Sequence, residues 1–287
     1  MNLPFVAARA YRPLLCVENE DADFDADLAD KYRGECLKIS VHWAIVERDG
    51  WGYVDRKIGS FDGPLFINIK GAPSSITLAE TCRPIPAHAW GDYASFVSET
   101  ITRYPTVYIV EFMNEPDTSA SWAEWWLGCW GDDYASGVYY GEFVNAVYDT
   151  LKPRYPLVRF IAGAFIRSDS DFASGALATM QTDGASFHYY PQCGATSEYT
   201  HIERTMRAGT KLPLYFSETG LLYDDANAAD CEQVQAAYLA SLQEYSNVML
   251  VNYYTLGCRA WDWRNSSIYG DDCRIKPAVA AYERFFR

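Results

Sequence analysis

Two glutamates in short motifs have the residue type and the placement needed for acid–base chemistry. Glu115 lies within residues 112–116 (FMNEP), and Glu218 lies within residues 216–220 (FSETG). Each motif follows an apolar, strand-like run, so each glutamate is expected where a strand passes into a loop. Two carboxyl groups so placed can cleave a glycosidic bond with retention, because one protonates the leaving oxygen while the other attacks the anomeric carbon. We predict Glu115 as the acid–base and Glu218 as the nucleophile.

The elements that must position these glutamates alternate along the 287-residue chain. Eight apolar runs are expected to be strands, and most are continuous, which is typical of strands buried on both faces of a parallel sheet. They cover residues 14–17, 37–46, 64–69, 107–112, 159–165, 185–189, 214–217 and 248–254. Helical patterns cover residues 23–35, 54–61, 91–104, 139–152, 172–180, 198–208, 231–246 and 277–286.

Eight strand–helix units predict an α/β fold, a (β/α)8 TIM barrel, as a single domain covering residues 1–287. A doubly wound sheet is the alternative, but it would need a glycine-rich turn after the first strand, which is absent. A barrel brings the carboxyl ends of its strands to one face. Glu115 after the fourth strand and Glu218 after the seventh could then lie about 5 Å apart, as a retaining mechanism requires.

Composition limits the classes of partner. The formal net charge of −14 disfavours nucleic acid, because phosphate binding requires clustered Lys and Arg. No apolar run approaches about 18 residues, so we expect neither a transmembrane helix nor a membrane partner. The four histidines lack metal-binding spacing and the eight cysteines form no Cys-x-x-Cys, so no metal and no other cofactor is predicted. The sequence does not indicate an oligomeric state.

The cysteines leave the cellular compartment open. We interpret Cys16 and Cys36 as small core residues, whereas Cys258 and Cys273 could form a bridge and Cys129 or Cys193 could pair with other loop cysteines. No signal peptide is visible at the N-terminus. We expect a cytoplasmic location, with secretion as the alternative.

With both glutamates placed, the sequence resembles the glycoside hydrolases of clan A over nearly the whole predicted barrel. Residues 111–116 are similar to the clan's fourth-strand motif, in which Asn precedes the acid–base Glu. Residues 216–220 are similar to its nucleophile motif, and residues 186–191 to its sixth strand. The resemblance implies a retaining β-glycosidase or endoglycanase that acts on carbohydrate, including polysaccharides, without a cofactor.

The resemblance also implies roles for residues beside the carboxylates. Asn114 would donate a hydrogen bond to the sugar 2-hydroxyl, and Tyr190 would touch the nucleophile. His188 would point inward with Tyr190, and strand alternation agrees, because residues two apart share a face. The structural alternatives are a turn-capping Asn114 and a core His188 without catalytic function.

Two positions depart from the clan's pattern. The clan usually carries an Arg in its second strand, and the matching residue is Lys38, which cannot form the bidentate contacts of Arg. The clan usually has a Trp near the end of its eighth strand, where Tyr253 or Trp261 could serve. These departures concern the sugar that is recognised and leave the carboxylate pair untouched.

Further residues could bind substrate at the expected cleft. His42, Trp43 and Asn68 fall at the ends of the second and third strands and could line the sugar pocket. Trp122 and Trp126 belong to an extended Trp-rich loop after the fourth strand and could stack on sugar rings. Long loops are often functional, but such tryptophans could also form a small satellite core.

Rival functions remain open at this point. A non-catalytic carbohydrate-binding TIM barrel would bind sugar without hydrolysing it. An unrelated barrel enzyme would need a metal-ligand cluster or a Schiff-base lysine, for which Lys38 and Lys70 are the strand-end candidates. An inverting hydrolase would hold its carboxyl groups roughly 6.5–9.5 Å apart. Sugar identity, linkage and exo or endo action cannot be read from the sequence.

Overall fold

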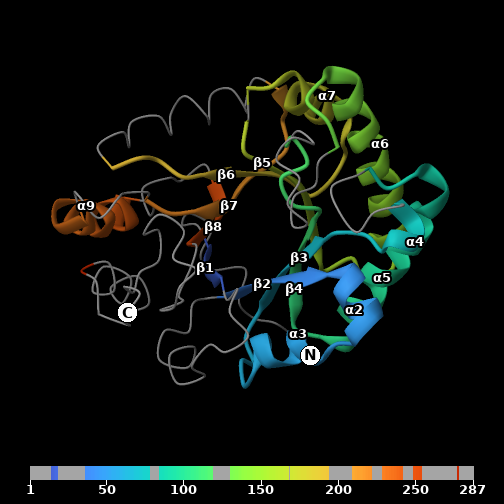
Figure 1. The fold of residues 1–287 in the computed structure, drawn as a ribbon, viewed down its shortest axis with the longest axis horizontal. Helices are drawn as coiled ribbons and strands as arrows, with labels where there is room; N and C mark the ends of the chain where they lie inside the picture. Colours follow the sequence, from blue (N-terminus) through green and yellow to red (C-terminus); the bar gives the residue numbers. More distant parts are fainter. Residues whose placement is uncertain are drawn as a thin grey trace.

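Eight parallel strands form the centre of the molecule and close into a barrel (Figure 1). The computed structural model describes residues 14–18, 36–77, 84–118, 130–167, 169–193, 209–221, 228–241, 248–253 and Pro277. Neighbouring strands pair in chain order, and β1 also pairs with β8, which closes the ring. The strands are β1 (Leu14–Glu18), β2 (Cys36–His42), β3 (Leu65–Lys70), β4 (Val107–Phe112), β5 (Arg159–Phe165), β6 (Gly184–Tyr189), β7 (Leu214–Thr219) and β8 (Val248–Tyr253).

Helices lie outside the ring of strands, with α5 to α7 on one side and α9 on the opposite side (Figure 1). The described helices are α2 (Trp43–Asp49), α3 (Gly52–Ile58), α4 (Ser74–Thr77), η1 (Ala87–Ala89, a 3-10 helix), α5 (Trp90–Arg103), α6 (Tyr134–Leu151), α7 (Asp171–Thr179) and α9 (Ala228–Ser241). The helices expected at residues 23–35 and 198–208, and all of the last expected helix except Pro277, lie outside the described residues.

The predicted strands are confirmed, and the largest difference occurs at the second one. This strand was expected to run to residue 46, but β2 ends at His42 and α2 begins at Trp43. Trp43 and Val46 are three residues apart, so a helix buries both on one face. A short apolar run does not by itself distinguish a strand from a helix, which explains the error.

Alternation along the strands separates two buried environments. Ile39 and Ile67 belong to the large apolar core that also includes the outer helices. Phe66 belongs to a second cluster on the barrel's inner side, made of Cys16, Cys36, Phe66, Ile109, Ile161 and Tyr215. Towards the carboxyl ends of β2 and β3, inward positions become polar, with Lys38, Ser40 and Asn68 all buried. An apolar cluster of side chains therefore fills one part of the barrel interior, and a layer of polar side chains lies beside it.

Two disulfides connect neighbouring elements. Cys16 and Cys36 are register partners on β1 and β2 and form a bridge, so our interpretation of them as simple core residues is incomplete. Cys193, just after β6, is bridged to Cys231 in α9, with Cα atoms 5.8 Å apart. The other candidate partners, Cys129, Cys258 and Cys273, lie outside the described residues.

The segment after β4 differs from the long loop that was predicted. Helix α6 begins at Tyr134, because the Asp133 side chain caps it by accepting a hydrogen bond from the Ser136 amide at 2.7 Å. Trp130 is buried, and its ring centroid lies 4.8 Å from that of Phe143. Trp130 therefore belongs to the core, while residues 119–129 of the predicted Trp-rich loop, which was expected to cover residues 117–138, lie outside the described residues.

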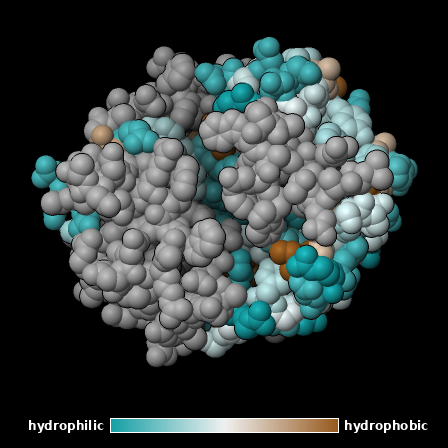
Figure 2. Space-filling view, viewed as in Figure 1, coloured by the Kyte–Doolittle hydropathy of each residue, from teal (hydrophilic) through white to brown (hydrophobic). Residues whose placement is uncertain are grey.

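The described surface is mostly hydrophilic on the face that Figure 2 shows, with small scattered apolar patches. The large apolar side chains that are exposed among the described residues are Tyr134, Leu157 and Ile166. None of the helices in the described ranges combines the length and the apolar character that crossing a membrane requires.

Candidate active site

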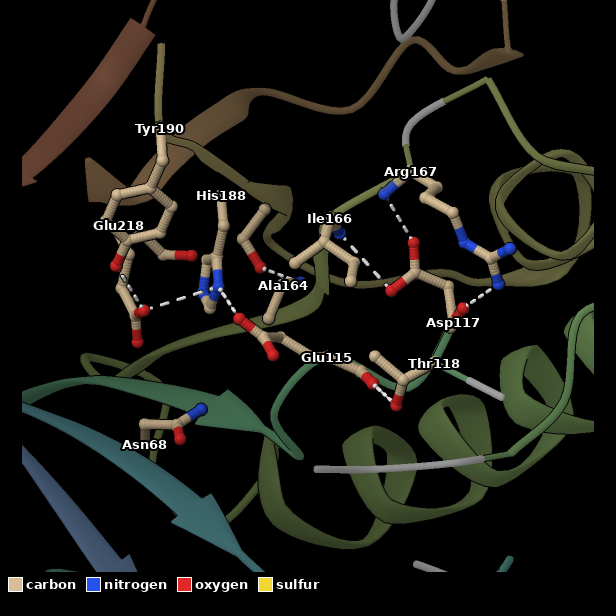
Figure 3. A network of polar contacts seen from close by, with 12 residues as sticks. Asn68, Glu115, Asp117, Thr118, Ala164, Ile166, Arg167, His188, Tyr190 and Glu218 are labelled. Carbon is tan, nitrogen blue, oxygen red and sulfur yellow. Dashed lines mark hydrogen bonds and ion pairs between the residues drawn. The ribbon is translucent and has the colours of Figure 1, made fainter. Parts of the chain in front are cut away.

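The side chains of Glu115 and Glu218 converge at the carboxyl ends of their strands (Figure 3). Glu115 lies three residues beyond β4, and Glu218 is the second-last residue of β7 rather than a residue after it. One carboxylate oxygen from each and a ring nitrogen of His188 all lie within 4.8 Å of one another. Barrel closure thus brings together two glutamates that are distant in sequence.

The backbone that presents Glu115 has an unusual conformation. Met113 and Glu115 have positive φ angles of 64° and 46°, which residues other than glycine rarely adopt. The Asn68 side-chain amide donates to the Met113 carbonyl at 2.7 Å and to the Glu111 carboxylate at 3.0 Å. Thr118 donates to the Glu115 carbonyl through its hydroxyl at 2.9 Å and its amide at 3.3 Å. These contacts hold the turn on both sides of the glutamate.

His188 connects the two glutamates. Its side chain is fully buried, and Nδ1 lies 2.8 Å from Glu115 Oε1 and 3.3 Å from Glu218 Oε2. Burial lowers the pKa of His188, but the charges of Glu218 and Glu115 outweigh it and the net pKa is raised. A protonated imidazole at this place donates to one carboxylate and attracts both.

Glu218 is held in its ionised form. Lys38 Nζ donates to Oε1 at 2.5 Å, and the Tyr190 hydroxyl donates to Oε2 at 2.8 Å. Burial raises the pKa of Glu218, but the charges of His188, Lys38 and Lys70 outweigh that effect and hold the pKa at about 2. An ionised carboxylate is the state that a nucleophile requires.

Lys38 is the cation that faces Glu218 from inside the barrel. It is fully buried, and its ammonium group also lies 3.0 Å from Glu18 Oε2 and 3.1 Å from the Ser217 carbonyl. Burial lowers the pKa of Lys38, but the charges of Glu18, Glu218 and Glu111 outweigh that effect, and the net pKa is raised. The three N–H groups of one ammonium therefore meet three acceptors, which is how a point charge serves where Arg would form a fork.

Comparison with solved structures finds the same fold in glycoside hydrolases. A family 39 glycoside hydrolase from the gut symbiont Bacteroides cellulosilyticus WH2 is 16% identical with a TM-score of 0.63, over 96% of this chain and 64% of that one. An exo-β-1,4-mannosidase from Opitutaceae bacterium strain TAV5 is 10% identical with a TM-score of 0.67, over 96% and 59%. An endo-1,4-β-D-mannanase from Thermotoga petrophila RKU-1 is 14% identical with a TM-score of 0.60, over 95% and 99%.

The chain has the fold of clan A glycoside hydrolases. It spans less than two thirds of the length of the first two of these proteins, at 64% and 59%, and nearly all of the third. No protein-family model and no curated protein matches the sequence.

The remaining predicted site residues occupy different environments. Asn68 supports the β4 turn from β3, and Asn114 is buried beside Glu115 in the chain. His42 is a buried residue at the end of β2, where it pairs in register with Lys70. Trp43 does not line a pocket as expected, because its ring stacks on Phe96 of α5 within the outer core. Tyr253 is the last residue of β8, and its side chain is not among the described parts of the structure. Trp122, Trp126 and Trp261 lie outside the described residues.

Glu18 and Asp117 were not predicted as site residues. Lys38 was matched to the clan's second-strand Arg and was expected to leave the carboxylate pair untouched, but it contacts the Glu218 carboxylate directly. The signal that could have predicted a buried ion pair is a single lysine inside an otherwise apolar strand, because a buried cation requires a buried anion as its partner. Glu18 supplies that charge from the neighbouring strand β1. The contacts of Asp117 depend on the end of β5 and have no sequence signal of their own.

Tyr190→Phe should shift the acidic limb of the kcat/KM profile upward by about one pH unit. The substitution removes one donor to the Glu218 carboxylate, and a hydrogen bond to a charged group is worth about 1.5–3 kcal/mol. The pKa of Glu218 should rise in consequence. The control is Tyr155→Phe, which removes a hydroxyl bonded to Ser98 at 2.7 Å in the outer helical layer. An unchanged limb in Tyr190→Phe would contradict this role.

Proposed function

We propose that this chain is a retaining glycoside hydrolase that cleaves β-linked glycosides or polysaccharides, built as a single (β/α)8 barrel domain over residues 1–287. The observation that carries the proposal is the approach of the Glu115 and Glu218 carboxylate oxygens to within 4.8 Å. A retaining pair is separated by about 5–5.5 Å, whereas an inverting pair needs roughly 6.5–9.5 Å to admit a water molecule.

In the proposed mechanism, Glu115 and Glu218 act in two steps. Glu115 protonates the glycosidic oxygen while Glu218 attacks the anomeric carbon, which gives a covalent glycosyl-enzyme. Glu115 then takes a proton from water, and the water displaces Glu218 with a second inversion. The Glu115 side chain is 16% exposed and that of Glu218 is 6% exposed, which suits an acid–base that must exchange protons with solvent and a nucleophile that need not.

The neighbouring residues have supporting roles in this proposal. Lys38 and Tyr190 hold Glu218 ionised and oriented for attack. His188 contacts both glutamates and fixes their relative position. Asn114 donates to the sugar 2-hydroxyl, a bond that strengthens as positive charge develops on the sugar ring.

The proposed partner is a carbohydrate, with neither a nucleic acid nor a membrane as partner. Among the compared proteins, an exo-β-1,4-mannosidase and an endo-1,4-β-D-mannanase share the fold, which supports a β-linked substrate. The Cys193–Cys231 bridge favours an oxidising compartment over the cytoplasm that the sequence led us to expect.

The three groups at the centre could also be read as metal ligands, because two carboxylates and an imidazole lie within reach of one ion. Lys38 weighs against that reading, since its buried ammonium is 2.5 Å from Glu218 and would repel a second cation. We therefore propose hydrolysis by the carboxylates themselves, without a metal or another cofactor.

The anomeric configuration of the first product tests the proposal. A panel of aryl β-glycosides (glucoside, mannoside, xyloside and galactoside), followed by proton NMR in the presence of EDTA, should show the β-anomer forming first, at an unchanged rate. An α-anomer would indicate inversion, and activity lost to EDTA and restored by a metal would favour the metal reading. Sugar binding without turnover across aryl glycosides, β-glucan and mannan would favour the non-catalytic barrel.

A further inference from the structure

Asp117 is a buried carboxylate two residues after Glu115 that contacts a different strand. Its Oδ1 accepts the Ile166 amide at 3.2 Å, and its Oδ2 accepts the Arg167 amide at 2.7 Å, just beyond the end of β5 (Figure 3). The Arg167 guanidinium donates to the Asp117 backbone carbonyl. Asp117 therefore fastens the segment that carries Glu115 to the neighbouring strand end by three hydrogen bonds.

The segment that Asp117 fastens is conformationally unfavourable. Glu115 has a φ of 46°, and a residue other than glycine in this backbone conformation costs about 1 kcal/mol or more. The conformation therefore persists only where the surrounding structure enforces it. Thr118 contacts the Glu115 carbonyl from the following turn. The Trp130 amide donates to the Pro116 carbonyl at 2.9 Å. The Glu115 side chain itself contacts His188 of β6, whereas Asp117 connects the backbone of this segment to the end of β5.

The chemistry of the contact requires a carboxylate. Burial raises the pKa of Asp117 to about 6, although the amides of Arg167 and Ile166 oppose that rise. An isolated buried carboxylate is unfavourable unless its oxygens are satisfied. An Asn has one acceptor oxygen and could satisfy one of the two amides, while an Ala could satisfy neither. The site therefore provides a graded series of variants.

We propose that Asp117 is a positioning residue that sets the geometry of Glu115 for proton donation, by clamping the loop after β4 to the end of β5. This proposal rests on the proposed function, in which Glu115 is the acid–base. Asp117 touches neither of the two central carboxylates through a described hydrogen bond. The clamp acts through the backbone, and a shift of about 1 Å in a catalytic group can cost on the order of 100-fold in rate. The charge of Glu115 also acts directly on Asp117 and helps to raise the pKa of Asp117.

Leaving groups of different acidity test the proposal. A 2,4-dinitrophenyl leaving group needs no protonation to depart, whereas an alkyl alcohol leaves only when an acid protonates it. Asp117→Ala should lower kcat/KM for an alkyl β-glycoside by about 10- to 100-fold, and for the 2,4-dinitrophenyl β-glycoside by less than about threefold. Asp117→Asn should fall between Asp117→Ala and the wild type.

Two further variants keep the test decisive if Asp117→Ala folds poorly. Thr118→Val removes the hydroxyl that contacts the Glu115 carbonyl and should show a weaker form of the same leaving-group dependence. Asp183→Asn is the matched control, because Asp183 accepts the Phe160 amide at 2.9 Å near the start of β5. That control should lose stability and affect both substrates equally.

Glu115→Ala separates failure of this proposal from failure of the proposed function. If Glu115 is the acid–base, Glu115→Ala must lower kcat/KM for the alkyl glycoside far more than kcat/KM for the dinitrophenyl glycoside. If Glu115→Ala shows that pattern while Asp117→Ala and Thr118→Val reduce both substrates equally, Asp117 is only structural and the positioning role is wrong. If Glu115→Ala itself reduces both equally, the proposed function is wrong.

Discussion

Replacing Glu218 with Ala should lower kcat by on the order of 10⁴-fold or more, because removing a covalent nucleophile eliminates the reaction path and not a single contact. Glu218 is buried, and its carboxylate lies within 4.8 Å of the Glu115 carboxylate. Lys38 keeps Glu18 as its partner in the variant, so the fold should survive.

Small anions provide the decisive readout for this variant. Azide or formate can occupy the space left by the Glu218 side chain and attack an activated glycoside, so activity should return in proportion to their concentration. With azide the product should be the α-glycosyl azide, since only one inversion then occurs. Ser217→Ala is the control, because the Ser217 hydroxyl has no hydrogen-bond partner in the described structure. Near-normal turnover by Glu218→Ala without an added anion would contradict the assignment.

Replacing Lys38 with Met should have the second largest effect, on both stability and pH dependence. Lys38 contacts two buried carboxylates, Glu18 at 3.0 Å and Glu218 at 2.5 Å. Removing one partner of a buried ion pair costs about 3–5 kcal/mol, because the remaining charge is left uncompensated. The free energy of unfolding, measured with denaturant at pH 7, should fall by about that amount.

The sign of the pH effect follows from the pKa of Glu218. Folding lowers that pKa from an ordinary value of 4.5 to about 2. Glu218 therefore contributes stability above pH 4.5, and this contribution is lost as the pH falls towards 2. Without Lys38 the pKa should rise, so the acidic limb of kcat/KM should move to higher pH and the acid-dependent loss of stability should become smaller.

A double variant separates the two effects of Lys38. In Lys38→Met with Glu18→Gln, one of the abandoned carboxylates is neutral, so part of the lost unfolding free energy should return. The acidic limb of kcat/KM should stay displaced, because Glu218 still lacks its cation. If the unfolding free energy and the acidic limb of kcat/KM both recover in the double variant, the charge of Lys38 is not what holds Glu218 ionised, and the catalytic role of Lys38 is wrong.

The sequence was sufficient for the strands because burial on both faces leaves a simple pattern. Strands β4 and β5 match their predicted bounds, since each is a mostly apolar run; the charged residues are Glu111 within β4 and Arg159 at the start of β5. The two glutamates could also be placed, because Glu115 lies just beyond such a run and Glu218 lies near the end of another. Short apolar segments carry less information, and for that reason the strand-to-helix change at Trp43 was not foreseen.

The parts that could not be predicted depend on contacts across the closed barrel. Lys38 and Glu218 are 180 residues apart, so their pairing exists only once β2 and β7 are placed in the ring. Met113 and Glu115 have positive φ angles, which neither residue type indicates, and their carbonyls accept hydrogen bonds from Asn68 and Thr118. Spacing alone likewise does not reveal that Cys16 faces Cys36, because that depends on strand register.

Covalent trapping of the nucleophile tests the central claim most directly. The protein is treated with an activated 2-deoxy-2-fluoro-β-glycoside of the sugar that it hydrolyses best. The glycosyl-enzyme should then accumulate, because the good leaving group favours formation of this intermediate while the fluorine slows hydrolysis of the intermediate. Mass spectrometry of the digested protein should find one fluoroglycosyl group on the peptide that contains Glu218. A label on Glu115, or no label in a protein that releases an inverted product, would contradict the account.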